Sequence, residues 1–433
     1  MNVIKIGGST LRTAEDFERL AERLAAHHPP PAVVVVSALP MVTRQLEQAA
    51  RLAEQRRLPE SLEVLGRIVR HHEELAGVVL SDSAIRQALA MLAGELQQRT
   101  ERLLRGVSLT GELTPRTLDR IVSVGEKLAL HLLHHALSQR GLSVATLPAS
   151  ELIVTDATFG NAAPLEDAIA ERVRQRLLPA FDRADYILTE GFVGATLEGE
   201  TTTMGKESST LTAALLARQL SARELVLYTP VPGIFTADPM EVASARRIDH
   251  LHYDDAERLA RAGLKLLFPT MIAPLRAATS RLRITALDAT SDEGTQIDAE
   301  QEDGNSPFVV MCDVLECVQL ARSEKTHLLE YPPSRTIVSA VEFGGNAFLV
   351  GEPGALSGYR HHASVHQCQY VRVWARWRAQ SRRSDLVRHV AEIAGIEAMA
   401  VSFTERDVLA CAITSSSAPV LPALHEVLLR LLE

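Results

Sequence analysis

The feature that most constrains the fold is the alternation of short β-branched runs with long helical patterns over the first 290 residues. The segments "NVIKIG" (2–7) and "AVVVVSAL" (32–39) are continuous rather than alternating apolar runs, which is typical of parallel strands buried on both faces. The segment between them, "AEDFERLAERLAAHH" (14–28), places its apolar residues at helical spacing. The opening therefore predicts a β-α-β unit with a right-handed crossover.

A stretch without strand signals interrupts this alternation between residues 41 and 137, and we expect a helical insertion at about 41–139. The alternation then resumes, and the whole pattern predicts an α/β fold with a mainly parallel sheet of roughly seven or more strands. The expected helices of the insertion lie near 41–57, 60–78, 82–104 and 115–139. The later strands are expected in "LSVATLPA", "DYILTEGF", "ELVLYT" and "LRITAL", with helices near 164–178 and 208–220.

A domain boundary is expected in "DATSDEGTQIDAEQEDGNSP" (288–307), which is rich in Asp, Glu, Gly and Ser. A chain of 433 residues is too long for a single hydrophobic core. We therefore expect a first domain at 1–290 and a linker at 291–307. Strand-like and helix-like segments beyond it predict one or two small α+β units at 308–433.

The charge balance excludes some classes of partner. The net charge of −9, from 45 basic and 54 acidic residues, argues against a nucleic-acid or anionic-membrane partner, because both need a basic face. The N-terminus lacks the pattern of a signal peptide, and no apolar run approaches the length of a membrane span, so we expect a cytoplasmic protein. No CxxC pair occurs, so we expect reduced thiols and no metal site at Cys312, Cys317, Cys368 and Cys411.

The segment "KIGGST" (5–10) directly follows the first predicted strand. Gly7 and Gly8 allow the backbone to approach a phosphate, and Lys5 could neutralise phosphate oxygens during transfer. The segment lacks the GxxxxGK[ST] pattern of a P-loop, and a Gly-Gly pair after a strand is more often a plain turn. Both interpretations stay open at this point.

The segment "SVGEKLAL" (123–130) places Glu126 within an apolar helical pattern. Glu126 lies four residues from both Val122 and Leu130, so it shares their inward face. A carboxylate that faces a core needs a partner. That partner is either a structural cation or the ammonium group of a substrate.

Two further segments could reach a ligand at the carboxyl ends of the strands. The prolines and glycine of "YTPVPGIFTADP" (228–239) force an irregular loop after a strand, at the edge where open α/β sheets bind ligands. A plain surface turn is the alternative. Lys265, in "GLKLLFP" (263–269), either extends along the apolar surface towards water or points at a nucleotide phosphate.

Taken together, seven segments resemble the aspartate kinase family, in the same order, over residues 1 to about 297. The C-terminal part is more faintly similar to the tandem regulatory ACT domains of that family, most clearly in "PVLPALHEVLLRLL" (419–432). The seven segments are "KIGGST", "VVVVSALPMVT", "GELTPRTLDRIVSVGEKLA", "TDATFGNA", "GFVGATLEGETTTMGKESSTLTAALLA", "YTPVPGIFTADPMEVASARRIDHLHYDDAERLARAGLKLLFP" and "EGTQI".

The resemblance implies an amino-acid-kinase fold followed by ACT-like domains, and transfer of the γ-phosphoryl group of ATP, with Mg²⁺, to the β-carboxylate of L-aspartate. It implies catalytic roles for Lys5, Lys206 and Lys265. It implies that the nucleotide is held by Gly7, Gly8, Ser9, Ser37, Thr229, Phe235, Asp238 and Lys265. It implies that aspartate is held by Thr43, Glu126, Lys206 and Ser209, with Glu126 binding its ammonium and Lys206 its carboxylate.

The sequence departs from the family pattern at the centre of this site. The family segment T-T-L-G-R-G-G-S-D appears as "TTMGKESST" (202–210), so Lys206 replaces an arginine and Thr210 replaces an aspartate. A lysine lacks the bidentate fork that suits a carboxylate, and a threonine carries no negative charge. In the nucleotide loop, Pro230 and Pro232 replace two carboxylates. Glu207 is a gain that either replaces the missing carboxylate or repels the phosphates.

Three functions follow from these features. The first is an active aspartate kinase, the second is a kinase for another small carboxylate, and the third is a catalytically weak paralogue that binds a ligand or a partner subunit. The C-terminal region lacks the glycine-rich effector turn usual in ACT domains, and "RWRAQSRRSD" (376–385) occupies that place in its second half. We therefore expect this region to pair subunits in a homo-oligomer instead of sensing lysine or threonine.

Overall fold

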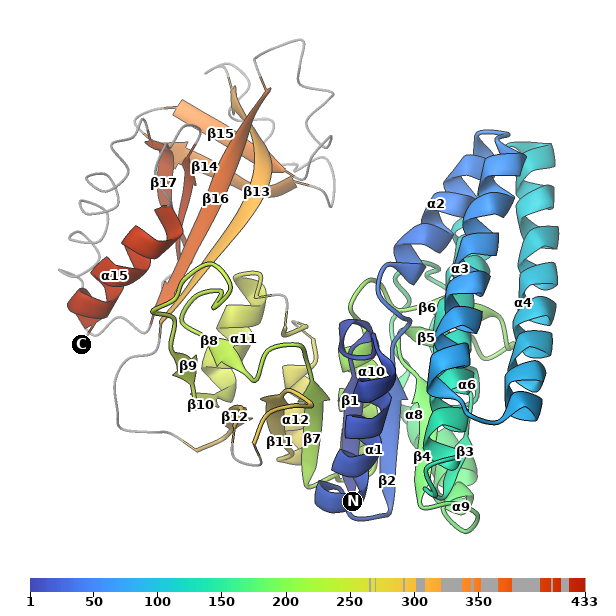
Figure 1. The fold of residues 1–433 in the computed structure, drawn as a ribbon. Helices are drawn as coiled ribbons and strands as arrows, with labels where there is room; N and C mark the ends of the chain where they lie inside the picture. The colour runs from blue at the N-terminus through green and yellow to red at the C-terminus, as the bar shows by residue number, and fades with distance from the viewer. Residues whose placement is uncertain are drawn as a thin grey trace. The chain divides into compact units, whose positions relative to one another are not determined.

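The structure is a computed structural model, and its chain folds into two compact units (Figure 1). The first unit comprises Met1–Gly233, Asp249–Tyr253 and Leu267–Glu300, and the second comprises Ile234–Ile248, Asp254–Leu266 and Gln301–Glu433. The residues that the structure describes are 1–264, 266–268, 270–290, 293–300, 308–320, 337–343, 346–351, 365–375, 398–405, 408–413 and 420–432.

The first unit is built on an eight-stranded sheet in the order β10-β12-β11-β7-β1-β2-β4-β3. Neighbouring strands are parallel except for β11 and β12, which are antiparallel. Every residue of β2 and β4 is buried, which confirms the mainly parallel sheet that the apolar runs predict. The strands are β1 (Asn2–Ile6), β2 (Ala32–Val36), β3 (Val144–Thr146), β4 (Tyr186–Glu190), β7 (Glu224–Tyr228), β10 (His250–His252), β11 (Arg281–Thr285) and β12 (Thr295–Asp298).

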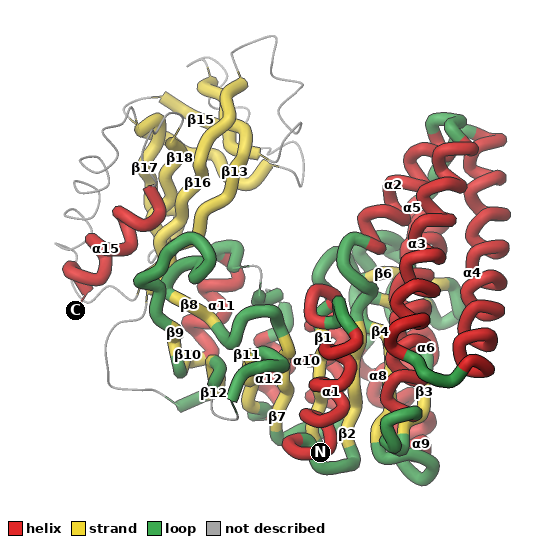
Figure 2. Tube along the Cα trace, in the orientation of Figure 1, coloured by secondary structure: helices red, strands yellow, loops and turns green. Residues whose placement is uncertain are grey.

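Helices cover both faces of this sheet, and Figure 2 shows them around its strands. The helix α1 (Ala14–His27) begins at a capping box in which Asp16 accepts the Thr13 backbone N–H at 2.8 Å, and it buries Phe17, Leu20 and Leu24. The remaining elements around the sheet are η1 (Gly8–Thr10), α7 (Ala149–Leu152), α8 (Glu166–Arg172), η2 (Val173–Leu177), α9 (Leu178–Ala180), α10 (Ser209–Gln219), α12 (Ile272–Ala278) and the hairpin of β5 (Val193–Ala195) and β6 (Thr201–Thr203).

The helical insertion between β2 and β3 is confirmed, with one difference from the prediction. The helix predicted at 115–139 is two helices that meet at Ser123, so that Glu126 lies in the first turn of the second one. A Cβ placed on Gly125 would lie 2.7 Å from Val42, so the lack of a side chain at Gly125 lets α6 pack closely against α2. The helices are α2 (Val42–Glu54), α3 (Leu58–Val79), α4 (Ser83–Thr110), α5 (Pro115–Val122) and α6 (Val124–Ser138).

The second unit contains a six-stranded antiparallel sheet in the order β14-β15-β13-β16-β18-β17. The prediction of α+β structure beyond residue 308 is confirmed for the described residues, but the strands form one shared sheet. The assignment to ACT domains stays a prediction. Its elements are β8 (Ile234–Phe235), β9 (Arg247–Ile248), α11 (Tyr253–Arg261), β13 (Phe308–Leu320), β14 (Ile337–Phe343), β15 (Asn346–Gly351), β16 (Val365–Ala375), β17 (Ala398–Glu405), β18 (Val408–Ile413) and α15 (Val420–Leu432).

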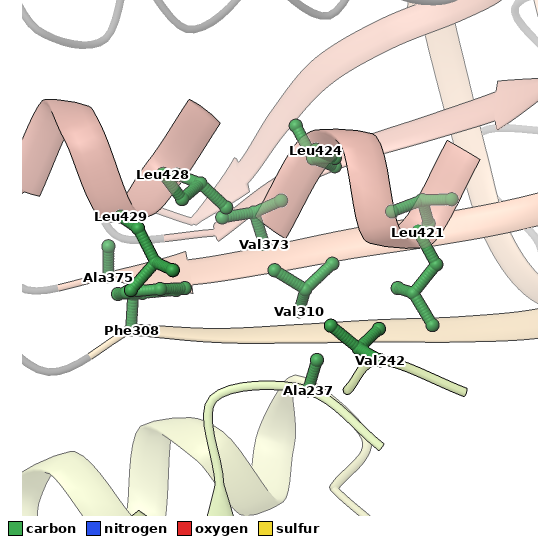
Figure 3. Close-up of a cluster of buried hydrophobic side chains, with 11 residues drawn as sticks. Ala237, Val242, Phe308, Val310, Val373, Ala375, Leu421, Leu424, Leu428 and Leu429 are labelled. Carbon is green, nitrogen blue, oxygen red and sulfur yellow. The ribbon is translucent and has the colours of Figure 1, made fainter. Parts of the chain in front are cut away.

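The core of the second unit includes residues that precede the predicted boundary (Figure 3). Ala237 and Val242 pack in one apolar cluster with side chains of β13, β16 and α15. The buried His425 of α15 hydrogen-bonds the hydroxyls of Thr236 at 2.7 Å and Ser244 at 3.2 Å. Residues 234–248 therefore belong to the second unit although they lie within the predicted first domain.

Candidate functional site at the carboxyl ends of the strands

The carboxyl ends of the parallel strands meet at one edge of the sheet, which we call the strand edge. The last residue of β1, Ile6, is in register with Val36 of β2 and Tyr228 of β7. In turn, Val36 is in register with Glu190 of β4, and Tyr228 with Thr285 of β11. The segments that follow these strands therefore lie side by side, which brings Gly7, Gly8, Ser9, Ser37 and Thr229 to the strand edge as predicted.

Lys5 is half-buried near the end of β1, beside the glycines that follow it. Its Nζ lies 3.5 Å from the position that a Cβ would take on Gly7, so the ammonium folds back over this turn. Burial lowers the pKa of Lys5 from 10.5 to about 8, and the negative charge of Glu207 partly opposes this shift. The ammonium is therefore mostly protonated at pH 7 and is available to an anion.

Gly8 is required by the packing of the backbone. A Cβ placed on Gly8 would overlap the carbonyl oxygen of Ala38, in the segment that follows β2. The backbone of the Gly-Gly turn therefore lies directly against the neighbouring loop of the strand edge.

Replacing Gly8 by alanine is expected to destabilise the protein by about 2–3 kcal/mol, because the added methyl group forces the two loops apart. Urea unfolding measures this change. The matched control is Gly94→Ala in α4, where a Cβ meets no atom within 4 Å and helix propensity favours alanine by about 1 kcal/mol. Equal stability of the Gly8 variant and the native protein would show that the two loops separate freely.

Glu126 is 3% exposed, so its carboxyl group is buried beside the strand edge. Its Oε1 accepts a hydrogen bond from the hydroxyl of Thr43 at 3.4 Å, and its Oε2 has no hydrogen-bond partner among the residues that the structure describes. Burial raises the pKa of Glu126 from 4.5 to about 8, against the backbone N–H groups of Glu126 itself and Ala38, and the nearby Glu190 raises it further. Among the described residues we find no cation paired with it, so the structural ion pair is not observed.

The loop before α10 carries the residues that depart from the family pattern. Lys206 exposes 81% of its side chain and lies 3.4 Å from a carboxylate oxygen of Glu47. The hydroxyl of Thr210 donates to the carbonyl oxygen of Glu207 at 2.9 Å, and Glu207 itself adopts a left-handed backbone conformation with φ of 67°. Thr210 therefore closes the loop locally.

Ser209 is the first residue of α10, and it packs against the segment that follows β4. It is buried, and a Cβ on Gly191 would overlap its side chain. This contact brings the start of α10 to the strand edge. The predicted roles of Lys206 and Ser209 towards aspartate stay predictions.

The nucleotide residues of the prediction are divided between the two units. Thr229 lies at the strand edge, where its hydroxyl donates to the carbonyl oxygen of Val231 at 2.6 Å. A cavity of about 280 Å³ is lined by both Thr229 and Ser9. Phe235 and Asp238 belong to the second unit, where the exposed Asp238 accepts the backbone N–H of Met240 at 2.9 Å. Lys265 lies outside the described residues.

Two buried carboxylates of this region were missed by the sequence reasoning. Glu190 ends β4, is 2% exposed and accepts the backbone N–H of Ala149 at 2.6 Å. Asp119 is 1% exposed and accepts the hydroxyl of Thr203 at 2.6 Å and the backbone N–H of Gly160 at 2.8 Å. Burial raises the pKa of both carboxyls. A glutamate that ends an apolar strand was the available signal for Glu190, whereas Asp119 offered none.

The strand edge suits a phosphorylated ligand and an amino acid. Lys5 supplies a cation beside a turn that admits close backbone approach, and the unpartnered Oε2 of Glu126 can accept an ammonium group. Within the described parts of the chain, no cluster of three or more His, Cys, Asp or Glu side chains could hold a metal by itself. No helix of those parts is both long and apolar enough to cross a membrane.

Comparison with known proteins agrees with this geometry. Residues 1–286 match the amino acid kinase family. The chain is 30% identical over 384 residues to the aspartokinase of Chlamydia trachomatis, covering 81% of this chain and 84% of that protein. It is 34% identical over 184 residues to the lysine-sensitive aspartokinase 3 of Escherichia coli, covering 41% of each.

A solved structure extends the likeness to the fold of nearly the whole chain. The crystal structure of Escherichia coli aspartokinase III in complex with aspartate and ADP superposes with a TM-score of 0.79 at 22% identity, over 99% of this chain and 100% of that one. These matches agree with the amino-acid-kinase fold that the motifs predict. The chain therefore belongs to the amino acid kinase family and, within it, to the aspartokinases.

Proposed function

We propose that this protein transfers the γ-phosphoryl group of ATP to the β-carboxylate of L-aspartate. The observation that carries the proposal is that Ala38 contacts both the glycine turn after β1 and the start of α6. Its carbonyl oxygen lies against Gly8, in the turn beside Lys5, and its Cβ lies 3.1 Å from the position of a Cβ on Gly125, next to Glu126. A site for an anion and a site for an ammonium group thus adjoin one loop.

The chemistry needs positioning and charge more than covalent help. An oxygen of the aspartate β-carboxylate attacks the γ-phosphorus, and the bond to the bridging oxygen breaks, so that ADP leaves with the electron pair. Lys5 stabilises the negative charge on the phosphoryl oxygens, and the turn of Gly7, Gly8 and Ser9 fixes the phosphates. Mg²⁺, bound with the nucleotide, supplies further positive charge.

We assign the remaining roles on the same basis. Glu126 and Thr43 hold the ammonium end of aspartate, and Lys206 and Ser209 hold its carboxylate. Ser37 and Thr229, at the strand edge, extend the nucleotide site within the first unit, and the nucleotide roles that the resemblance implies for Phe235, Asp238 and Lys265 stay predictions. Assembly of subunits through the C-terminal unit and a cytoplasmic location stay predictions.

One observation favours a second candidate, a weakly active paralogue that binds ligand or a partner subunit. The O–H of Thr210 is donated within its own loop, to the carbonyl oxygen of Glu207, and a hydroxyl carries no negative charge where the family has an aspartate. Among the described residues, it is the negative charge of Glu207, three residues earlier, that raises the pKa of Lys5. We propose that Glu207 takes over the missing negative charge, which would preserve activity.

Trapping of the acyl phosphate as a hydroxamate tests the proposed function. With Mg-ATP and hydroxylamine, we expect hydroxamate formation with L-aspartate and none with L-asparagine, which lacks the accepting carboxylate. Formation with another small carboxylate alone would assign a different acceptor. No turnover with any amino acid, together with a thermal shift by aspartate, would identify the paralogue.

A further inference from the structure

A second cavity, of about 390 Å³, lies in the helical insertion among α3, α4 and α6. These three helices contact one another, and Figure 1 shows α3 beside α4. Apolar side chains from each helix form its walls: Ala76 from α3, Leu89 and Ala93 from α4, and Leu128 from α6. Glu73 and Gln87 also line it and are exposed, so the cavity opens to solvent. None of these residues has a role in the proposed function.

His72 is the buried polar residue of this cavity, whose lining also includes Arg86, a side chain that donates to the carbonyl oxygens of Leu80 and Ser81. His72 lines the cavity, is 2% exposed and comes from α3. Its Nδ1 lies 2.8 Å from the carbonyl oxygen of Ile68, and a carbonyl can only accept, so Nδ1 carries the proton. Its Nε2 is buried and has no hydrogen-bond partner in the described parts of the chain. Burial lowers the pKa of His72 to about 4, so the ring is neutral at pH 7 and Nε2 is a bare acceptor.

The chemistry of a ligand follows from these two features. A buried acceptor without a partner costs about 1–3 kcal/mol, so a group that donates a hydrogen bond to Nε2 is stabilised there. The apolar walls favour a hydrocarbon body, and an engineered cavity of about 150 Å³ is already large enough to bind benzene. The cavity of 390 Å³ therefore has room for a bicyclic ring.

We propose that this cavity binds a small apolar molecule with a single O–H or N–H donor, of the phenol or indole class, whose donor bonds Nε2 of His72. The site is separate from the strand edge, so the inference does not depend on the proposed phosphoryl transfer.

Matched probes test the inference on the full chain. Indole donates one hydrogen bond, and 1-methylindole has the same ring without the donor. Calorimetry is expected to show that indole binds about tenfold more tightly, which corresponds to one hydrogen bond. Binding of indole is also expected to shift the ¹⁵N resonance of His72 Nε2. Equal affinity for the two probes, or no binding of either with only an ordered water on Nε2, would overturn the inference.

Two substitutions locate the site. Ala90→Leu fills the cavity from α4 and is expected to abolish indole binding. Ala88→Leu is the matched control, because Ala88 is exposed on the same helix and does not line the cavity. His72→Phe is expected to remove the preference for indole over 1-methylindole. If His72→Phe fails to fold, the two alanine variants still test the position of the site. Equal indole binding by Ala90→Leu and Ala88→Leu would contradict the proposed position.

Discussion

Replacing Lys5 by methionine is expected to lower the rate of acyl-phosphate formation about 10³-fold, the effect of removing a charge that stabilises a transition state. Lys5 is the cation beside the glycine turn, and methionine keeps an unbranched side chain without the ammonium. The hydroxamate assay at saturating ATP and aspartate measures the loss. The control is Arg99→Met, which removes an exposed cation from α4. A rate within tenfold of the native rate would exclude Lys5 from phosphoryl transfer.

The same substitution should not unfold the protein. The pKa of Lys5 in the folded state, about 8, lies below its ordinary value of 10.5. A lysine with a lowered pKa destabilises the fold at pH values below the folded pKa, and this cost fades as the pH rises from 8 to 10.5. Lys5→Met removes that cost, so its melting temperature at pH 7 is expected to equal or exceed that of the native protein.

Replacing Glu126 by glutamine is expected to lower kcat/KM for aspartate by about 10²- to 10³-fold, because the ammonium group loses a buried anionic partner. The KM for ATP is expected to stay within about twofold, since Glu126 is assigned to the amino acid. Steady-state kinetics with each substrate varied in turn separates the two. The control is Glu95→Gln, an exposed glutamate on α4. An equal change in both KM values would argue against this assignment.

Glu126→Gln is also expected to stabilise the protein without ligand at alkaline pH. The folded-state pKa of Glu126, about 8, lies above its ordinary value of 4.5. The cost of ionising it in the fold is absent below pH 4.5, grows as the pH rises and is complete above pH 8. The variant should therefore match the native protein at pH 4.5 and exceed it at pH 8 by on the order of 3 kcal/mol. Urea unfolding at the two pH values measures this difference.

The periodicity of the sequence was sufficient to predict the sheet and the helical insertion. Buried parallel strands are continuously apolar, and helices repeat their apolar residues every three or four positions, so both signals are local. The break at Ser123 was missed because Val122 and Val124 both continue the helical pattern. The helix that begins after the break packs Gly125 against Val42, a contact between residues 83 positions apart that no local pattern records.

The candidate site was predicted in part for the same reason. Glycines and a lysine at the end of a strand predict a ligand site at the strand edge, because parallel strands align their carboxyl ends. The burial of Glu126 followed from its helical position. The absence of a paired cation among the described residues did not, because that depends on which side chains the other elements bring to Glu126. Likewise, the electrostatic effect of Glu207 on Lys5 joins two segments 202 positions apart.

The chain passes between the two units after residues 233, 248, 253, 266 and 300. A gene fusion or deletion at one junction near residue 300 would therefore divide the core of the second unit. It would leave Thr236, Ala237 and Val242 attached to the first part, without the strand and helix that cover them. An exchange of the C-terminal region between relatives is therefore expected to keep this core intact only where residues 234–248 are exchanged with it.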